Sequence, residues 1–257
     1  MKQKMVIHCA SGFGNIGDEA ILQVMIERYI KKYQITIISL HSLKSQNYHS
    51  SPVRFITISD SKACKDAIIQ CDVFLLGGGG LLQDTTTIYN VSRWLKKLKI
   101  AIKYNKKTIV YANSIGPLKY KINRNMVKKQ LAKVDKIYVR DYLSYDLLNE
   151  FGIQSEVVAD PAFFLNISAQ EEQVQILRKF NLPDNYVAIS IRHWFDTNPF
   201  IPTSICTRFN IRSRKDKIRN RQYIESIREI VRYINDYYKK NVVFCSFCSD
   251  RDAKVSR

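Results

Sequence analysis

Short apolar runs alternate with helical patterns through the first 165 residues. The runs are typical of buried strands, and the helical segments between them are typical of a sheet covered by helices. The pattern predicts strands over Met5–Cys9, Ile35–Leu40, Val73–Leu76, Thr108–Ala112, Lys136–Val139 and Ser155–Val158. It predicts helices over Asp18–Lys32, Ser61–Gln70, Tyr89–Tyr104, Arg124–Lys133 and Tyr142–Phe151. We therefore expect an α/β fold with a doubly wound parallel sheet of about six strands over residues 1–165.

The rest of the chain predicts the start of a second domain. Residues 166–185 are polar and predict a linker with a short helix over Gln170–Phe180. A strand over Tyr186–Ile191, a helix over Tyr223–Lys240 and a strand over Val242–Phe247 then form a βαβ pattern. We expect residues 186–257 to begin a second Rossmann-like domain. Because about 70 residues are few for a domain, we expect this domain to be truncated.

The chain is strongly basic, with 41 Lys and Arg against 23 Asp and Glu, a formal net charge of +18. This charge favours anionic partners, and the composition of an AT-rich genome would explain it equally well. Nucleic acid is not expected, because no reader motif is present and the basic residues are dispersed. The basic stretch Arg208–Arg221 suggests either a surface for a lipid-linked sugar or the inner membrane face, or a solvated loop.

The sequence shows no targeting signal, and we therefore expect a cytoplasmic protein. The first residues have too short an apolar run for a secretory signal, and no window approaches the roughly 20 apolar residues of a membrane span. Six scattered cysteines without framework spacing suggest a reducing compartment. Cys245 and Cys248 form a CxxC without a second pair, so we expect no metal site.

Two glycine-rich segments follow predicted strands. The first, Gly12–Leu22, matches G-x-G-x-x-G between a strand and a helix, which suits a close backbone approach to a ligand. Asp18 and Glu19 sit where a phosphate would dock, so a simple capped turn is the alternative. The second segment, Leu75–Asp84, has four consecutive glycines, and the close approach of a ligand or of another loop would account for them.

Polar residues close the later predicted strands. Arg140 at a strand end could grip phosphate or carboxylate, with a local pairing to Asp141, or Asp141 as a helix cap, as the alternative. Asp160 closes a strand at the predicted boundary, and Arg192 closes the first strand of the second domain. His193 is more typical of an exposed or structural histidine than of a catalytic one.

The ordered blocks resemble the polysaccharide pyruvyl transferase family. The blocks are G-N-I-G-D-E-A-I-L, L-G-G-G-G-L-L-Q-D, S-I-G-P-L, V-R-D-x-x-S-x-x-x-L, A-D-P-A-F and I-S-I-R-x-W. The resemblance implies two Rossmann-like domains in a GT-B-like arrangement and transfer of a pyruvyl group from phosphoenolpyruvate to a sugar. It implies donor binding by Arg140. The family continues with a later block that holds an arginine and a histidine, which this chain lacks, so we expect weak or no turnover.

The candidate site combines anion-binding residues with acid–base residues. Phosphoenolpyruvate needs cations, a proton donor and a base. The expected anion-binding residues are Arg140 and Arg192, and the expected acid–base or sugar-holding residues are Asp18, Asp84 and Asp141. The residues expected to supply further substrate contacts are Gly14, Asn15, Gly17, Gly78 and Gly79. The scheme needs no cofactor and no metal.

Two other functions fit the same pattern. One is a nucleotide-sugar glycosyltransferase of GT-B shape, because fold alone does not fix chemistry. The other is a catalytically incomplete binding or scaffold subunit. For the enzyme we expect a sugar or lipid-linked saccharide acceptor, with contact to the inner membrane surface as a further expectation.

Overall fold

The computed structural model describes residues 2–183, 185–192, 194, 198–201, 205, 206, 209, 211–248 and 252. The chain divides into two compact units. The first contains Met1–Leu165 with Pro199–Pro202, and the second contains Asn166–Asn198 with Thr203–Arg257. Each unit is described by itself below.

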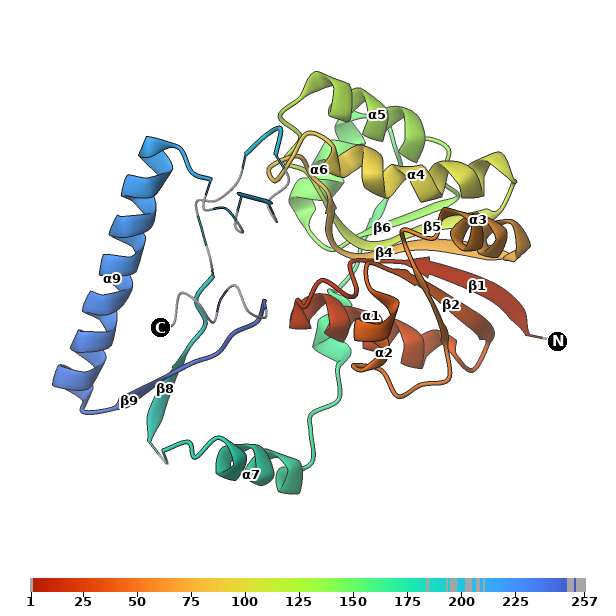
Figure 1. Ribbon diagram of the computed structural model, residues 1–257. Helices are drawn as coiled ribbons and strands as arrows, with labels where there is room; N and C mark the ends of the chain where they lie inside the picture. The colour runs from red at the N-terminus through yellow and green to blue at the C-terminus, as the bar shows by residue number, and fades with distance from the viewer. Residues whose placement is uncertain are drawn as a thin grey trace. The chain divides into compact units, whose positions relative to one another are not determined.

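The first unit is built on a parallel sheet of seven strands in the order β3-β2-β1-β4-β5-β6-β7 (Figure 1). The strands are β1 (Gln3–His8), β2 (Tyr33–Ser39), β3 (Arg54–Thr57), β4 (Val73–Leu82), β5 (Lys107–Ile115), β6 (Lys136–Val139) and β7 (Glu156–Val157). The order reverses beside β1, which is the arrangement of a doubly wound fold. The predicted α/β class is confirmed.

Helices connect successive strands and cover both faces of the sheet. They are α1 (Ile16–Tyr29), α2 (Ser42–Gln46), α3 (Ser61–Gln70), α4 (Asn90–Lys103), α5 (Lys121–Leu131), α6 (Tyr142–Glu150) and the 3-10 helix η1 (Pro161–Phe164). The bounds of α3 agree with the prediction at both ends. Asp60 caps α3, since its carboxylate accepts a hydrogen bond from the backbone N–H of Ala63 at 2.9 Å.

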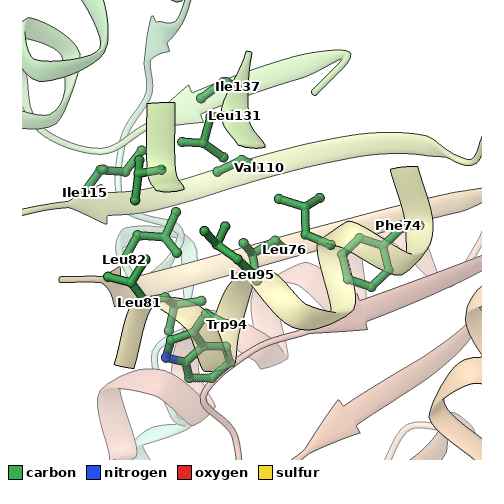
Figure 2. Packing of buried hydrophobic residues seen from close by; sticks show 14 of the residues in the cluster. Phe74, Leu76, Leu81, Leu82, Trp94, Leu95, Val110, Ile115, Leu131 and Ile137 are labelled. Atoms are coloured by element: carbon green, nitrogen blue, oxygen red, sulfur yellow. The ribbon is translucent and has the colours of Figure 1, made fainter. Parts of the chain in front are cut away.

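Two apolar clusters fill the space between sheet and helices. On one face, α1 packs Leu22 and Met25 against Ile7 of β1. On the other face, Ile68 of α3, Leu95 of α4 and Leu131 of α5 pack with Phe74 and Leu76 of β4 (Figure 2). Successive residues of Met5–Ile7 in β1 and of Val73–Leu76 in β4 thus belong to opposite clusters, as the two-residue period of a strand requires. This explains why these parts of the central strands are continuously apolar.

Two strands of the first unit differ clearly from the prediction, and the short helices α2 and η1 were not predicted. The strand β3 was missed, because a four-residue strand at a sheet edge carries too little apolar pattern to stand out. The strand β4 continues through Gly77–Gly80 to Leu82, where the sequence predicted a loop after Leu76. Low strand propensity of glycine is overridden here by parallel pairing with β5, which aligns Gly77 with Tyr111 and Gly79 with Asn113.

The second unit contains α7 (Gln170–Lys179), β8 (Tyr186–Ile189), α9 (Arg214–Tyr238) and β9 (Asn241–Phe244). The strands β8 and β9 pair in parallel. The helix α9 begins at Arg214, nine residues before the predicted start at Tyr223. The first helical turns of α9 are rich in charged residues, so they show no apolar period that would have predicted them. Ser213 caps the helix, because its hydroxyl accepts a hydrogen bond from the N–H of Asp216 at 3.1 Å.

The second half of the predicted basic stretch is therefore helical, and the interpretation as a loop is wrong for residues 214–221. Within the part of the chain that the structure describes, no helix combines the length and the apolarity needed to cross a membrane.

Candidate functional site at the carboxyl edge of the sheet

The predicted site residues of the first unit gather where parallel strands end. The segment 12–17, here called the glycine turn, follows β1, and Gly78 and Gly79 lie near the end of β4. Ser114 lies near the end of β5, and Arg140 directly follows β6. Because all strands are parallel, these segments share one edge of the sheet, where open α/β sheets bind ligands.

Arg140 is held in a fixed orientation by two neighbours. Its Nε donates to the Ser114 hydroxyl at 2.8 Å, and its Nη1 donates to Asp160 Oδ2 at 2.5 Å. The side chains of Arg140 and Asp160 keep 25% and 22% of their surface exposed. Among the described residues nothing accepts a hydrogen bond from Nη2. The guanidinium therefore presents one pre-oriented, half-buried edge that could hold a carboxylate or a phosphate.

Asp141 caps the helix after Arg140. Its carboxylate accepts from the Ser144 N–H at 2.8 Å and from the Ser144 hydroxyl at 2.7 Å. Burial acts to raise the pKa of Asp141, but hydrogen bonds from Ser114 and Ser144 and the charge of Arg140 outweigh it, so the pKa is lowered. Asp141 is thus an ionised base and cap, not a proton donor at neutral pH. The predicted capping role is observed, and a role as general acid disagrees with this environment.

Asp84 is buried and surrounded by donors. Its carboxylate accepts from the backbone N–H groups of Lys119 at 2.8 Å and Tyr120 at 3.1 Å, and from Asn123 Nδ2 at 3.2 Å. These contacts anchor the segment between β5 and α5. A carboxylate so occupied has a structural role, and the catalytic prediction for Asp84 receives no support from its surroundings.

The glycine turn is stabilised from within by Asn15. Asn15 Oδ1 accepts the Gly17 N–H at 3.2 Å, and Asn15 Nδ2 donates to Asp18 Oδ2 at 2.7 Å. Asp18 lies next to β4, because a side chain on Gly79 would come within 2.9 Å of Asp18 Oδ1. The structure thus brings Asp18, Asn15, Gly17 and Gly79 together. Gly14 lies in the same turn.

Helix packing explains part of the second glycine segment. Gly78 has φ +69°, and an added Cβ would lie 2.2 Å from Ile21 Cγ2 of α1. A residue with a side chain would be strained there in its backbone and would push α1 away from β4. Close approach of α1, not of a ligand, accounts for this glycine.

Asn113 is a site residue that the sequence analysis did not single out. It is fully buried in β5, and its Nδ2 donates to the Leu76 carbonyl at 2.9 Å. Its Oδ1 has no partner among the described residues. The preceding Ala112 has φ +51°, a left-handed conformation that costs alanine about 1–2 kcal/mol, and the pairing with β6 shifts at this point. A strained residue and an unpaired acceptor beside Ser114 are common features of functional sites.

The candidate residues form two groups that adjoin where Gly79 of β4 pairs with Asn113 of β5. Arg140, Asp141, Ser114 and Asp160 surround the ends of β5 and β6, whereas Asn15, Asp18 and Gly79 surround the ends of β1 and β4. Three strand spacings of about 4.8 Å separate β1 from β6, or roughly 14 Å. Arg192 belongs to the second unit, where Tyr223 accepts its backbone N–H at 3.3 Å. His193 lies outside the described residues.

Two further observations concern a hollow elsewhere in the first unit and the lack of a metal-binding cluster among the described residues. A hollow of about 530 Å³ is lined by Lys136, Gly152 and Glu156 among others. It lies where β6 and β7 begin, at the edge opposite to the candidate residues. In the described ranges, no group of three or more His, Cys, Asp and Glu side chains could hold a metal ion.

Comparison with known proteins identifies a family. The family model described as polysaccharide pyruvyl transferase matches residues 15–257, nearly the whole chain. No curated protein matches.

Solved structures match the fold. A glycosyltransferase from Rickettsia africae aligns with a TM-score of 0.51 at 13% identity, over 97% of this chain and 70% of that one. An S. aureus MnaA–UDP structure aligns with a TM-score of 0.53 at 15% identity, over 100% of this chain and 65% of that one. An α-glucosyltransferase in complex with UDP-glucose and DNA aligns with a TM-score of 0.42 at 13% identity, over 61% of this chain. The chain spans 42% of that glucosyltransferase.

Proposed function

Because this chain belongs to the polysaccharide pyruvyl transferase family, we propose that it transfers a pyruvyl group from phosphoenolpyruvate to a sugar of a cell-wall or exopolysaccharide precursor. The observation that carries the proposal is the environment of Arg140. Its guanidinium is fixed by Ser114 and Asp160 and keeps a free edge among the described residues. Phosphoenolpyruvate carries two anionic groups, and a bidentate arginine is suited to either.

The chemistry conserves atoms and charge. A proton adds to the methylene carbon of phosphoenolpyruvate, and the central carbon becomes electrophilic. One sugar hydroxyl forms a C–O bond to that carbon and releases its proton. The bond from the central carbon to the phosphate oxygen breaks, inorganic phosphate leaves, and a second hydroxyl closes the ketal while its proton passes to the phosphate.

The residues of the first unit supply part of this scheme. Arg140 holds the anionic donor and compensates the charge that develops on the leaving phosphate. Asp141, ionised beside Arg140, is the candidate base for a sugar hydroxyl, provided that it exchanges a hydrogen bond from Ser144 for one from the substrate. Arg192 belongs to the second unit and stays a sequence prediction for a second cation. The proposal needs no metal and no cofactor.

The proposal places the protein in the cytoplasm, at or near the inner membrane face. Phosphoenolpyruvate is a cytoplasmic metabolite, and a lipid-linked acceptor would be reached at the membrane surface. The six cysteines carry no disulfide, which suits a reducing compartment.

The direct test is donor binding by calorimetry with Arg140→Ala and Arg140→Lys. We expect Arg140→Ala to weaken phosphoenolpyruvate binding about tenfold or more and Arg140→Lys to restore part of it, because lysine keeps the charge but loses the fork. Unchanged affinity in both variants would remove Arg140 from the site. Turnover of a sugar nucleotide without phosphate release from phosphoenolpyruvate would replace the proposed reaction with glycosyl transfer.

A further inference from the structure

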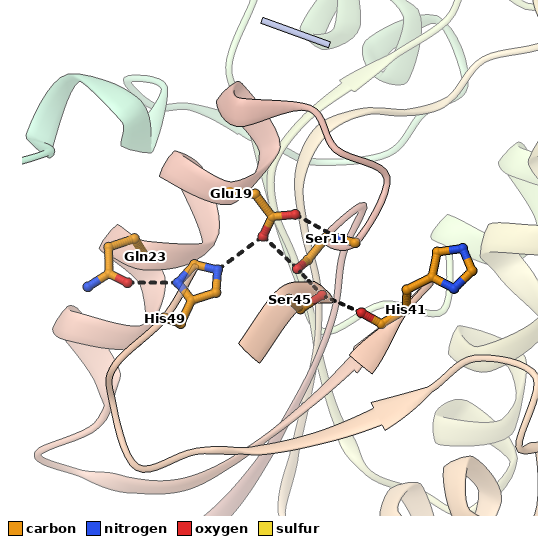
Figure 3. Close-up of polar contacts among 7 residues, drawn as sticks. Ser11, Glu19, Gln23, His41, Ser45 and His49 are labelled. Atoms are coloured by element: carbon orange, nitrogen blue, oxygen red, sulfur yellow. Dashed lines mark hydrogen bonds and ion pairs between the residues drawn. The ribbon is translucent and has the colours of Figure 1, made fainter. Parts of the chain in front are cut away.

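A buried hydrogen-bond network shapes the glycine turn, and Glu19 is at its centre (Figure 3). Glu19 lies in the first turn of α1 and is only 4% exposed. Its Oε1 accepts the Gly12 N–H at 2.7 Å, and its Oε2 accepts the Ser11 hydroxyl at 2.7 Å. The side chain of Glu19 is thus directed inward and ties the turn to α1, which agrees with the capped turn that the sequence offered as the alternative to a phosphate site.

His49 supports Glu19 from a separate segment of the chain. Its Nε2 lies 3.0 Å from Glu19 Oε2, and its Nδ1 lies 2.7 Å from Gln23 Oε1. The Gln23 amide is oriented by Glu27, since Gln23 Nε2 donates to Glu27 Oε1 at 2.6 Å. Both ring nitrogens of His49 therefore face oxygen acceptors.

Serine hydroxyls extend the network to the end of β2. The hydroxyls of Ser11 and Ser45 lie 2.7 Å apart, and Ser45 Oγ lies 3.1 Å from the His41 carbonyl. The network thus joins the glycine turn, α1 and the segment after β2, so the position of the turn depends on groups beneath it.

The same contacts limit what the turn can bind. An anion site at the start of a helix needs free backbone N–H groups. Here the Gly12 N–H is bound to Glu19 and the Gly17 N–H is bound to Asn15. Asp18 and Glu19 place two acidic side chains on the first helical turn. The turn is therefore a poor site for phosphoenolpyruvate, which is anionic at both ends.

The surface of the turn suits a sugar ring. Phe13 and Ile16, both on or beside the turn, remain 42% and 48% exposed. An exposed aromatic ring such as that of Phe13 can pack against the C–H face of a neutral sugar ring. Gly80 of β4 faces open space, because an added Cβ would meet nothing within 4 Å. The turn follows β1, about three strand spacings from β6, and Gly79 beside it pairs with Asn113 of β5, so a ring on the turn would adjoin the residues around Arg140.

We propose that the glycine turn is a separate subsite for the neutral hexose or hexosamine ring of the acceptor, and that Glu19 and His49 are positioning residues for this turn. The inference rests on the proposed function, because it assigns the second substrate of that reaction. It divides the carboxyl edge between an anionic donor at β5 and β6 and a neutral acceptor at β1 and β4.

The first test separates the subsites with phosphoenolpyruvate. We expect Glu19→Gln and Phe13→Ala to bind phosphoenolpyruvate within about twofold of the wild type, while Arg140→Ala loses about tenfold. Loss of donor affinity in Phe13→Ala or Glu19→Gln equal to that of Arg140→Ala would overturn the separate subsite. If all three variants, Arg140→Ala included, leave the affinity unchanged, the donor assignment fails and the separate subsite does not.

The second test follows the turn itself by amide NMR and hydrogen exchange. In Glu19→Gln we expect the Gly12 amide to exchange about tenfold faster, since an amide nitrogen replaces one acceptor oxygen. Glu172→Gln, an exposed carboxylate on α7, is the matched control and should leave this amide unchanged.

The third test uses N-acetyl-D-glucosamine as the probe. Addition should shift the amide resonances of residues 12–17 in the wild type and not in Phe13→Ala, which leaves the buried network intact. A wild-type turn that does not respond to the sugar would overturn the saccharide assignment. Equal responses of Phe13→Ala and wild type would do the same.

Discussion

His8 shows what burial does to a single titratable residue. It is fully buried on β1, its ring centroid lies 4.8 Å from that of Trp94, and neither ring nitrogen has a partner among the described residues. Burial, and then the charge of Lys97, lowers the pKa of His8 to about 3. His8 is therefore neutral in the folded protein and takes up a proton on unfolding in mild acid.

This difference makes stability depend on pH. Below pH 6.5, the pKa of an unperturbed histidine, His8 is protonated in the unfolded chain but stays neutral in the folded protein. The free energy of unfolding therefore falls by about 1.4 kcal/mol per pH unit between pH 6 and 4. We expect His8→Leu to lose this component of the slope in urea unfolding measured at pH 7, 6 and 5. His41→Leu, at an exposed histidine, is the control. Identical slopes for His8→Leu and wild type would contradict the buried neutral state.

Asp84 is the second case at the residue scale. In Asp84→Asn the new amide nitrogen would face backbone N–H donors, so we expect a loss of about 1–3 kcal/mol in thermal unfolding. Asp146→Asn, on the exposed side of α6, should have little effect. If Asp84→Asn keeps full stability but abolishes phosphate release, the carboxylate has a chemical role after all.

At the scale of elements, the contact between α1 and β4 depends on missing side chains. Gly78→Ala would place a methyl group 2.2 Å from Ile21 and keep an unfavourable positive φ. We expect it to destabilise the fold by roughly 2–5 kcal/mol in denaturant unfolding. Gly80→Ala, two residues along the same strand, has open space and should change stability by less than about 1 kcal/mol. Equal effects of the two substitutions would refute the packing explanation.

The elements also show what sequence patterns can predict. Both ends of α3 were predicted correctly, because the aspartate cap and the apolar face of this helix indicate the same bounds. The strand β4 was predicted to end at Leu76, because glycine has a low strand propensity. In the structure, pairing with β5 continues the strand through the four glycines. The helix α9 begins nine residues before its predicted start, because charged residues give no apolar period. Long-range pairing and solvent-facing helix turns are the properties that local patterns do not carry.

The candidate site was likewise predicted only in part. The positions of Arg140 after β6 and of the glycine turn with Asp18 after β1 followed from the sequence, because parallel strands end on one edge, whereas Gly77–Gly80 lie inside β4. Their partners did not follow. Asp160 lies 20 residues from the Arg140 that it holds, and His49 lies 30 residues from Glu19. Nothing in the spacing of these residues distinguishes a buried positioning carboxylate from a reactive one.

At the scale of the whole molecule, the two units differ in how much they bury. Ile137 and Val139 of β6 are buried, whereas no described residue of β8 is. The β8–β9 sheet has two strands, which is marginal by itself. We expect the amides of β8 to exchange with solvent roughly 100-fold faster than those of β6, or faster still, in hydrogen-exchange mass spectrometry. Both strands have four residues, so they form a matched pair. Comparable protection would indicate a partner that covers the second unit.

The pairing of β1 with β4 has a consequence for synthesis. Met5 pairs with Val73, and the Lys4 N–H donates to Asp72 across 68 positions of chain. A ribosome adding about 5–20 residues per second needs roughly 3–14 s to cover that interval. During this time the apolar runs of β1 and β2 emerge without their central neighbour. For several seconds in every round of translation, the nascent chain can therefore pair wrongly with an exposed strand of another chain.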